Sequence, residues 1–224
     1  MKKAIAILLS LTMILGLAAC GNSASQTEQP STEDTSVESK ADTESAENGT
    51  DMENTDNQDV QNHKALVAYF SATGTTKGVA EHIANGLNAD IYEIVPEEPY
   101  TDADLNYNDN NSRTTIEMND PNARPAISGS VENMEQYDII FVGYPIWWGE
   151  APRIVSTFME SYDFSGKTIV PFCTSGGSGI GSSASNLERL TSGATWLDGR
   201  RLNGSDSQDT VMEWVNSLDL NLAE

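Results

Sequence analysis

The chain is poor in cysteine, histidine and basic residues. Its 224 residues include two Cys and two His, too few for a disulfide framework or a zinc-type cluster, so we expect no metal site. Only 12 Lys and Arg accompany 34 Asp and Glu, which gives a formal charge of −22 at pH 7. Such an acidic chain is unsuited to nucleic acid or to an anionic lipid surface. We therefore expect no nucleic-acid partner and favour docking to basic protein surfaces.

The chain also lacks an apolar run long enough to span a bilayer. The longest is the mostly apolar stretch 4–17, which follows Lys2 and Lys3 and is shorter than the roughly 20 residues of a transmembrane helix. It ends in Leu-Ala-Ala-Cys, which resembles the bacterial lipobox, in which the cysteine becomes the lipidated first residue. We expect residues 1–20 to be a lipoprotein signal peptide and Cys20 to anchor the protein on the outer side of the bacterial cell membrane. A short transmembrane anchor is the alternative.

Residues 21–63 have almost no hydrophobic side chains. They carry eleven Asp or Glu against one lysine, Lys40, and are otherwise rich in Ser, Thr, Asn and Gln. Such a segment cannot bury a core and is predicted to be a disordered acidic tether, with a root-mean-square span of about 35 Å. The remaining residues, 64–224, suit one domain. They carry a formal charge of −14, because the first 63 residues contribute −8 of the total.

Residues 64–224 alternate between strand-like apolar runs and helical patterns. Five strands are predicted at residues 65–70, 91–95, 137–143, 168–173 and 194–197. The polar stretch 96–136, with a weak helical pattern around 112–118, predicts an elaborated loop. Ser205 and Gln208 are expected to form a capping box for the last helix. This alternation favours an α/β fold with a parallel sheet, helices on both faces and ligands at the carboxyl ends of the strands.

A hydroxyl-rich turn follows the first predicted strand. Four of the six residues 71–76 are Ser or Thr, and they lead directly into a helical pattern. Hydroxyls and unpaired backbone N–H groups at a helix N-terminus can hold a phosphate without Lys or Arg. Gly74 allows the backbone to approach closely. The turn therefore predicts phosphate binding, and a plain strand-to-helix turn with one capping hydroxyl is the alternative.

Two further loops follow predicted strands and are expected at the same edge of the sheet. Residues 144–150 contain the adjacent Trp147 and Trp148, and residues 174–181 are rich in glycine. A phosphate turn, an indole pair and a loop of free amides together suit a phosphorylated planar aromatic ligand. Alternatively, the tryptophans plug the core.

Three segments, 69–76, 143–149 and 172–179, together resemble the flavodoxin family, and more closely its lipoprotein-type members with a tryptophan loop. The resemblance covers residues 64 to about 218. It implies a flavodoxin-like three-layer sandwich with strand order 2-1-3-4-5 and noncovalent FMN. The phosphate would lie on the first loop, the isoalloxazine against the second and its pyrimidine edge against the third. The implied FMN-binding residues are Ser71, Ala72, Thr73, Gly74, Thr75, Thr76, Pro145, Ile146, Trp147, Trp148, Gly149, Thr174, Ser175, Gly176 and Gly177.

The third loop departs from many flavodoxins, because residues 174–181 contain no aromatic side chain to cover the outer face of the flavin. In this respect it is similar to the flavodoxin-fold quinone reductases. We expect a membrane-tethered FMN electron-transfer protein with a basic redox partner, in which the flavin carries the chemistry and no side chain is catalytic. The alternatives are an FMN-dependent NAD(P)H:quinone-type reductase acting on nicotinamide and quinone molecules, and a non-redox binding module.

Overall fold

The computed structural model describes residues 63–220. The predicted signal peptide, Cys20 and all of the predicted tether except its last residue lie outside the described residues. Within the described part, no helix combines the length and the apolar character that a membrane span requires.

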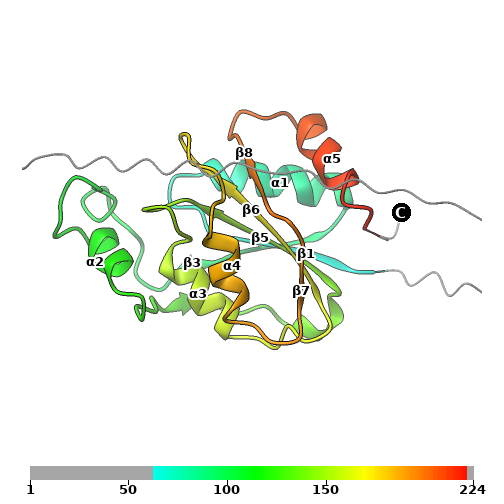
Figure 1. The fold of residues 1–224 in the computed structure, drawn as a ribbon, viewed down its shortest axis with the longest axis horizontal. Coiled ribbons are helices and arrows are strands. Elements are labelled where there is room, and N and C mark those ends of the chain that lie inside the picture. Colours follow the sequence, from blue (N-terminus) through cyan, green and yellow to red (C-terminus); the bar gives the residue numbers. More distant parts are fainter. Residues whose placement is uncertain (1–62, 221–224) are drawn as a thin grey trace, which may run out of the picture. The chain divides into compact units, whose positions relative to one another are not determined.

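A parallel sheet forms the centre of the fold (Figure 1). Its strands, in spatial order, are β2 (Asp90–Glu93), β1 (Ala65–Tyr69), β5 (Ile139–Pro145), β6 (Thr168–Thr174) and β7 (Thr195–Trp196). In the centre, Val67 of β1 lies opposite Ile91 on one side and Phe141 on the other. This is the order 2-1-3-4-5, and the predicted flavodoxin-like α/β fold is confirmed.

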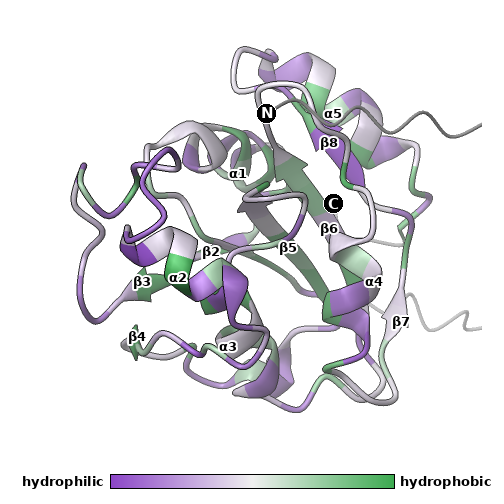
Figure 2. Ribbon diagram, turned by 60° about the vertical axis from the view of Figure 1, so that its left-hand side comes forward, coloured by the Kyte–Doolittle hydropathy of each residue, from purple (hydrophilic) through white to green (hydrophobic). Residues whose placement is uncertain are grey.

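Helices cover both faces of the sheet, as Figures 1 and 2 show. One face carries α1 (Thr75–Leu87) and α5 (Gln208–Asn216), and the other carries α3 (Arg153–Glu160) and α4 (Ser183–Glu188). Successive strand residues serve opposite faces, so Val67 packs with α1 and α5 while Leu66 packs with α3 and α4. This two-sided burial explains why the central strands read as continuous apolar runs.

The last strand differs from the prediction, because it is split into two short pieces along β6. The first is β7, and the second is β8 (Arg200–Leu202). Leu197 donates its N–H to Ile169 O, so residues 169 and 171 of β6 turn their backbone groups toward this edge. Pro171 has no N–H to offer there, and the edge strand is interrupted beside it.

The second predicted strand also differs, because it ends early and its last residue, Val95, joins another sheet. β2 stops at Glu93, and β3 (Val95–Pro96) pairs antiparallel with β4 (Ile127–Ser128). Pro96 therefore lies inside a short edge strand, where its missing N–H costs little. Residues 97–126 form a long excursion between β3 and β4.

Two short helices occur in the region between β3 and β5, and the last helix begins later than expected. The weak helical pattern is confirmed as α2 (Arg113–Asn119), and a short 3-10 turn, η1 (Met134–Gln136), precedes β5. The predicted capping box at α5 is wrong. Ser207 caps this helix by accepting from Thr210 N at 3.3 Å, because Asn203 N donates to Asp206 and holds the preceding residues in a turn.

Candidate functional site

The hydroxyl-rich turn lies between β1 and α1, at the carboxyl end of the sheet. Gly74 occupies the position before α1 with φ = 85°, a conformation that favours glycine. Among residues 63–220 no side chain caps α1, which leaves its first N–H groups open to a ligand. The Oγ of Ser71 is buried and has no hydrogen-bond partner among residues 63–220. An orphaned buried hydroxyl beside free amides is the pattern expected where a ligand supplies the missing acceptor.

Thr76 connects the first loop to the third. Its Oγ1 lies 2.8 Å from Oγ1 of Thr174, and both side chains are buried. Ile146 of the second loop donates its N–H to Thr174 O at 2.9 Å. The three loops therefore meet at one edge, as predicted. The Thr76 hydroxyl, however, already has a protein partner, unlike that of Ser71.

The tryptophan loop is a tight turn. Trp147 and Glu150 exchange both backbone hydrogen bonds at 2.9 Å. Trp148 and Gly149, between them, have φ values of 50° and 82°. Positive φ at both central residues defines a type I′ turn, which is costly for tryptophan and easy for glycine. The turn holds Trp148 at its tip.

The two tryptophans have different environments. Trp147 makes edge-to-face contacts with Phe70 and Tyr100, each with ring centroids 5.5 Å apart. Trp148 is 47% exposed. Trp147 is thus partly buried against the core, whereas Trp148 is exposed at the tip of the turn.

A cavity of about 280 Å³ lies between the first two loops and the excursion. Of the predicted residues, the cavity is lined by Ser71, Ala72, Thr73, Thr75, Thr76, Pro145, Trp147 and Trp148. The other predicted residues lie at the same edge but outside this lining: Gly74, Ile146, Gly149, Thr174, Ser175, Gly176 and Gly177. We call this space the first cavity. The FMN-binding role of all these residues stays a prediction.

The excursion supplies three lining residues that the sequence analysis missed: Leu105, Tyr107 and Thr114. Tyr107 is 73% exposed, so it stands at the rim. The only sequence signal was a pair of apolar residues, Leu105 and Tyr107, within a run of Asp and Asn. That signal shows that the loop packs somewhere, but it does not identify the partner.

Within the excursion, a polar network surrounds Tyr100, whose ring also packs edge-to-face on Trp147 of the tryptophan loop. Its hydroxyl donates to Glu117 at 2.6 Å, and Arg113 donates to the same carboxylate at 2.7 Å. The Arg113 guanidinium also lies over the Tyr100 ring, 4.2 Å from its centroid. Burial, followed by the Glu117 carboxylate, raises the pKa of Tyr100 far above its usual range. Tyr100 therefore stays a neutral hydrogen-bond donor, and its ring supports Trp147, which lines the first cavity.

The third loop is anchored by Arg201 of β8. Its Nε donates to Ser175 Oγ and its Nη2 donates to Ser175 O, both at 3.1 Å. Ser175 Oγ also accepts from Gly177 N at 3.3 Å and donates to Ser178 O. Arg201 lies outside the predicted set, because nothing in its local sequence indicates a contact 26 residues away. Gly176 and Gly177 stay exposed, although the N–H of Gly177 is already engaged by Ser175.

None of the described residues that line the first cavity is charged. A phosphate there would be held by hydroxyls, amides and the N-terminal end of α1, which suits an anion in an acidic protein. Cys173, just before the third loop, is fully buried, and burial raises its pKa to about 11. This thiol is protonated at physiological pH and behaves as a core residue. The hydroxyls and backbone amides around the first cavity therefore fit a phosphorylated ligand.

An open parallel sheet whose carboxyl-end loops surround a cavity is typical of α/β proteins that bind mononucleotides. The family model for flavodoxins matches residues 64–218. The chain belongs to the flavodoxin family. No curated protein matches it.

Several solved structures are similar. A candidate flavoprotein from Bacteroides eggerthii is 48% identical, with 71% of this chain and 99% of that one covered and a TM-score of 0.67. A second, from Bacteroides uniformis, is 46% identical over 70% and 99%, with a TM-score of 0.66. A flavoprotein from Lactobacillus acidophilus, solved in complex with FMN, is 23% identical over 68% and 99%, with a TM-score of 0.52. This last likeness is one of fold.

Proposed function

We propose that this protein binds FMN noncovalently at the first cavity and carries electrons between redox partners. The bound flavin supplies the redox chemistry. The chain positions it, with the phosphate on residues 71–76, the ring system beside Pro145, Ile146, Trp148 and Gly149, and the pyrimidine edge near residues 174–177. Trp147 also lines the first cavity and packs edge-to-face on Phe70.

The observation that carries the proposal is the orphaned hydroxyl of Ser71 in an uncharged, hydroxyl-lined cavity at the start of α1. Leaving such a group unpaired costs about 1 to 3 kcal/mol, and a phosphate oxygen would remove that cost. The flavodoxin membership and the FMN complex of a protein with the same fold support the same ligand.

The test is an FMN titration of the double variant Ser71→Ala, Thr73→Val. We expect each lost hydroxyl to weaken binding by about 1 to 3 kcal/mol, or roughly five- to 150-fold. Thr76 is a poor choice, because its loss would also leave Thr174 unpaired. Thr195→Val, on an exposed strand remote from the site, is the matched control. If the double variant binds FMN as tightly as the parent, the assignment is wrong.

A second candidate function is an FMN-dependent reductase that passes electrons from a nicotinamide to a quinone. It is favoured by the third loop, which carries no aromatic side chain to cover the flavin. Steady-state oxidation of NADH or NADPH with a soluble quinone, without any added reductase, separates the two. Turnover would favour the reductase, and its absence with FMN bound would favour the carrier. A protein that binds no FMN would be a non-redox module.

We also propose that the domain is a lipoprotein-type flavodoxin, tethered by Cys20 on the outer side of the bacterial cell membrane. The lipobox-like sequence and the acidic segment 21–63 support this location. Membrane-extracted protein should carry its lipid on an N-terminal peptide that begins at Cys20, as mass spectrometry can show. A membrane fraction that retains an unmodified Met1 would refute the proposal.

A further inference from the structure

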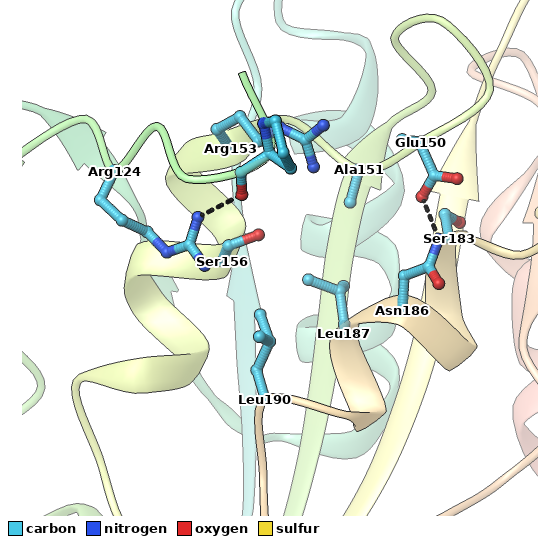
Figure 3. Close-up of a pocket in the computed structure, with 10 residues that line it drawn as sticks. Arg124, Glu150, Ala151, Arg153, Ser156, Ser183, Asn186, Leu187 and Leu190 are labelled. Carbon is cyan, nitrogen blue, oxygen red and sulfur yellow. Dashed lines mark hydrogen bonds between the residues drawn. The ribbon is translucent and has the colours of Figure 1, made fainter. Parts of the chain in front are cut away.

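A second cavity, of about 300 Å³, lies between α3 and α4, with residues of the excursion as its third wall (Figure 3). It shares no lining residue with the first cavity. Glu150, the last residue of the tryptophan turn, lies on its wall. The turn therefore stands between the two cavities, with its tryptophans in one and its carboxylate in the other.

Arg153, the first residue of α3, brings an unneutralised charge to the second cavity. Its Nη2 donates to Met118 O at 3.0 Å, but its Nε is sealed from solvent and has no acceptor within the described range 63–220. In that same range Arg153 has no carboxylate within 4.0 Å, whereas Arg124, on the same cavity wall, is paired with both oxygens of Glu160. A partly buried cation without a counter-ion attracts an anion strongly in a low dielectric environment.

Ser156 lies three residues further along α3, on the same side of the helix as Arg153. It is 6% exposed, and its Oγ makes no hydrogen bond to any described residue. Figure 3 shows this oxygen pointing into the cavity. An anion that entered here would therefore meet a guanidinium and a free hydroxyl together.

The α4 side of the cavity carries apolar side chains beside polar ones. Leu187 and Leu190, from α4 and its C-terminal end, line it with Ala151. Glu150 accepts from Asn186 Nδ2 at 2.8 Å and from Ser182 Oγ at 3.1 Å, which hold its carboxylate on the cavity wall. A neighbouring negative charge repels a dianion more strongly than a monoanion, and the leucines accept a hydrocarbon body.

We propose that the second cavity binds a small organic monocarboxylate. The carboxylate accepts from Arg153 and Ser156, and its apolar body packs against Leu187 and Leu190. This site is separate from the flavin site and is independent of whether FMN is the ligand there.

The test uses benzoate and hexanoate as probes, titrated into the full domain by calorimetry at constant ionic strength. We expect saturable 1:1 binding of at least one probe. For benzoate, the neutral analogue benzamide should bind at least tenfold more weakly, because it lacks the charge.

Two variants locate the site. Arg153→Gln keeps an amide donor for Met118 O and should weaken carboxylate binding at least tenfold, and Ser156→Ala should weaken it about threefold. Arg200→Gln removes the same charge from an exposed edge strand and should change nothing. An FMN titration of each variant reports separately on the flavin site.

Failure of both probes to bind the parent protein would overturn the proposal. So would equal binding by the parent and Arg153→Gln, or equal affinity for benzoate and benzamide. If Arg153→Gln does not fold, Ser156→Ala and the benzamide comparison decide the question.

Discussion

The two cavities are built on opposite electrostatic principles, although they share the excursion and the tryptophan turn as walls. The first is lined by hydroxyls and indoles without a charge, and it would hold a phosphate through amides and hydroxyls alone. The second is organised around an arginine that has no carboxylate partner among residues 63–220. An acidic domain can thus offer an anion either neutral hydrogen-bond donors or a single cation close to the binding site.

The largest expected effect concerns the turn that separates the cavities. Trp147→Ala should lower the free energy of unfolding of the apo protein by about 2 to 4 kcal/mol, because it leaves a cavity between Phe70 and Tyr100. The matched variant Trp148→Ala should cost under about 1 kcal/mol, since that side chain is half exposed. Urea denaturation measures both. Equal losses would mean that the two tryptophans share one environment.

A smaller effect is expected at Arg201. This cation lies outside the wall of the first cavity and holds the third loop in place. Arg201→Met removes its hydrogen bonds to Ser175 and to Asn203. We expect FMN binding to weaken about tenfold, or about 1.4 kcal/mol, because the loop must then be ordered on binding. An FMN titration measures this effect.

Two controls separate tethering from charge at this position. Arg201→Lys keeps the charge but loses the forked geometry, so it should fall between the parent and Arg201→Met. Arg200→Met should bind FMN normally. If Arg201→Lys matches the parent, charge rather than tethering explains the contribution of Arg201.

The smallest expected effect is on the redox potential of a flavin bound beside the uncharged wall of the first cavity. With no cation in that wall, the net charge of −14 on residues 64–224 and burial beside indole should both disfavour the fully reduced flavin anion. The potential of the last reduction step should lie below that of free FMN.

The contribution of distant charges to this potential depends on ionic strength. Screening beyond about 8 Å at physiological ionic strength should raise the potential by about 30 mV, or roughly 0.7 kcal/mol, as salt is added. Potentiometric titration at low and high salt measures this. A potential at or above that of free FMN would show that local hydrogen bonds outweigh net charge.

The central part of the fold could be predicted from sequence because its signals are local. Apolar runs predict the central strands, and helical spacing predicts α1, α3 and α5. The errors fall where a contact elsewhere decides the outcome. Pro171 of β6 interrupts the neighbouring edge strand, and the Asn203–Asp206 turn moves the start of α5 to Ser207.

The sequence by itself determined the hydroxyl turn, the tryptophan pair and the glycine loop, since each is one short segment at the end of a strand. Only the tertiary structure decided how they combine. The Thr76–Thr174 contact spans 98 residues, Arg201 reaches Ser175 over 26, and Tyr107 reaches the first cavity through the excursion. The unneutralised charge of Arg153 likewise emerges only when α3, α4 and the excursion pack together. Such contacts depend on where the chain returns in space, and local spacing carries no record of that.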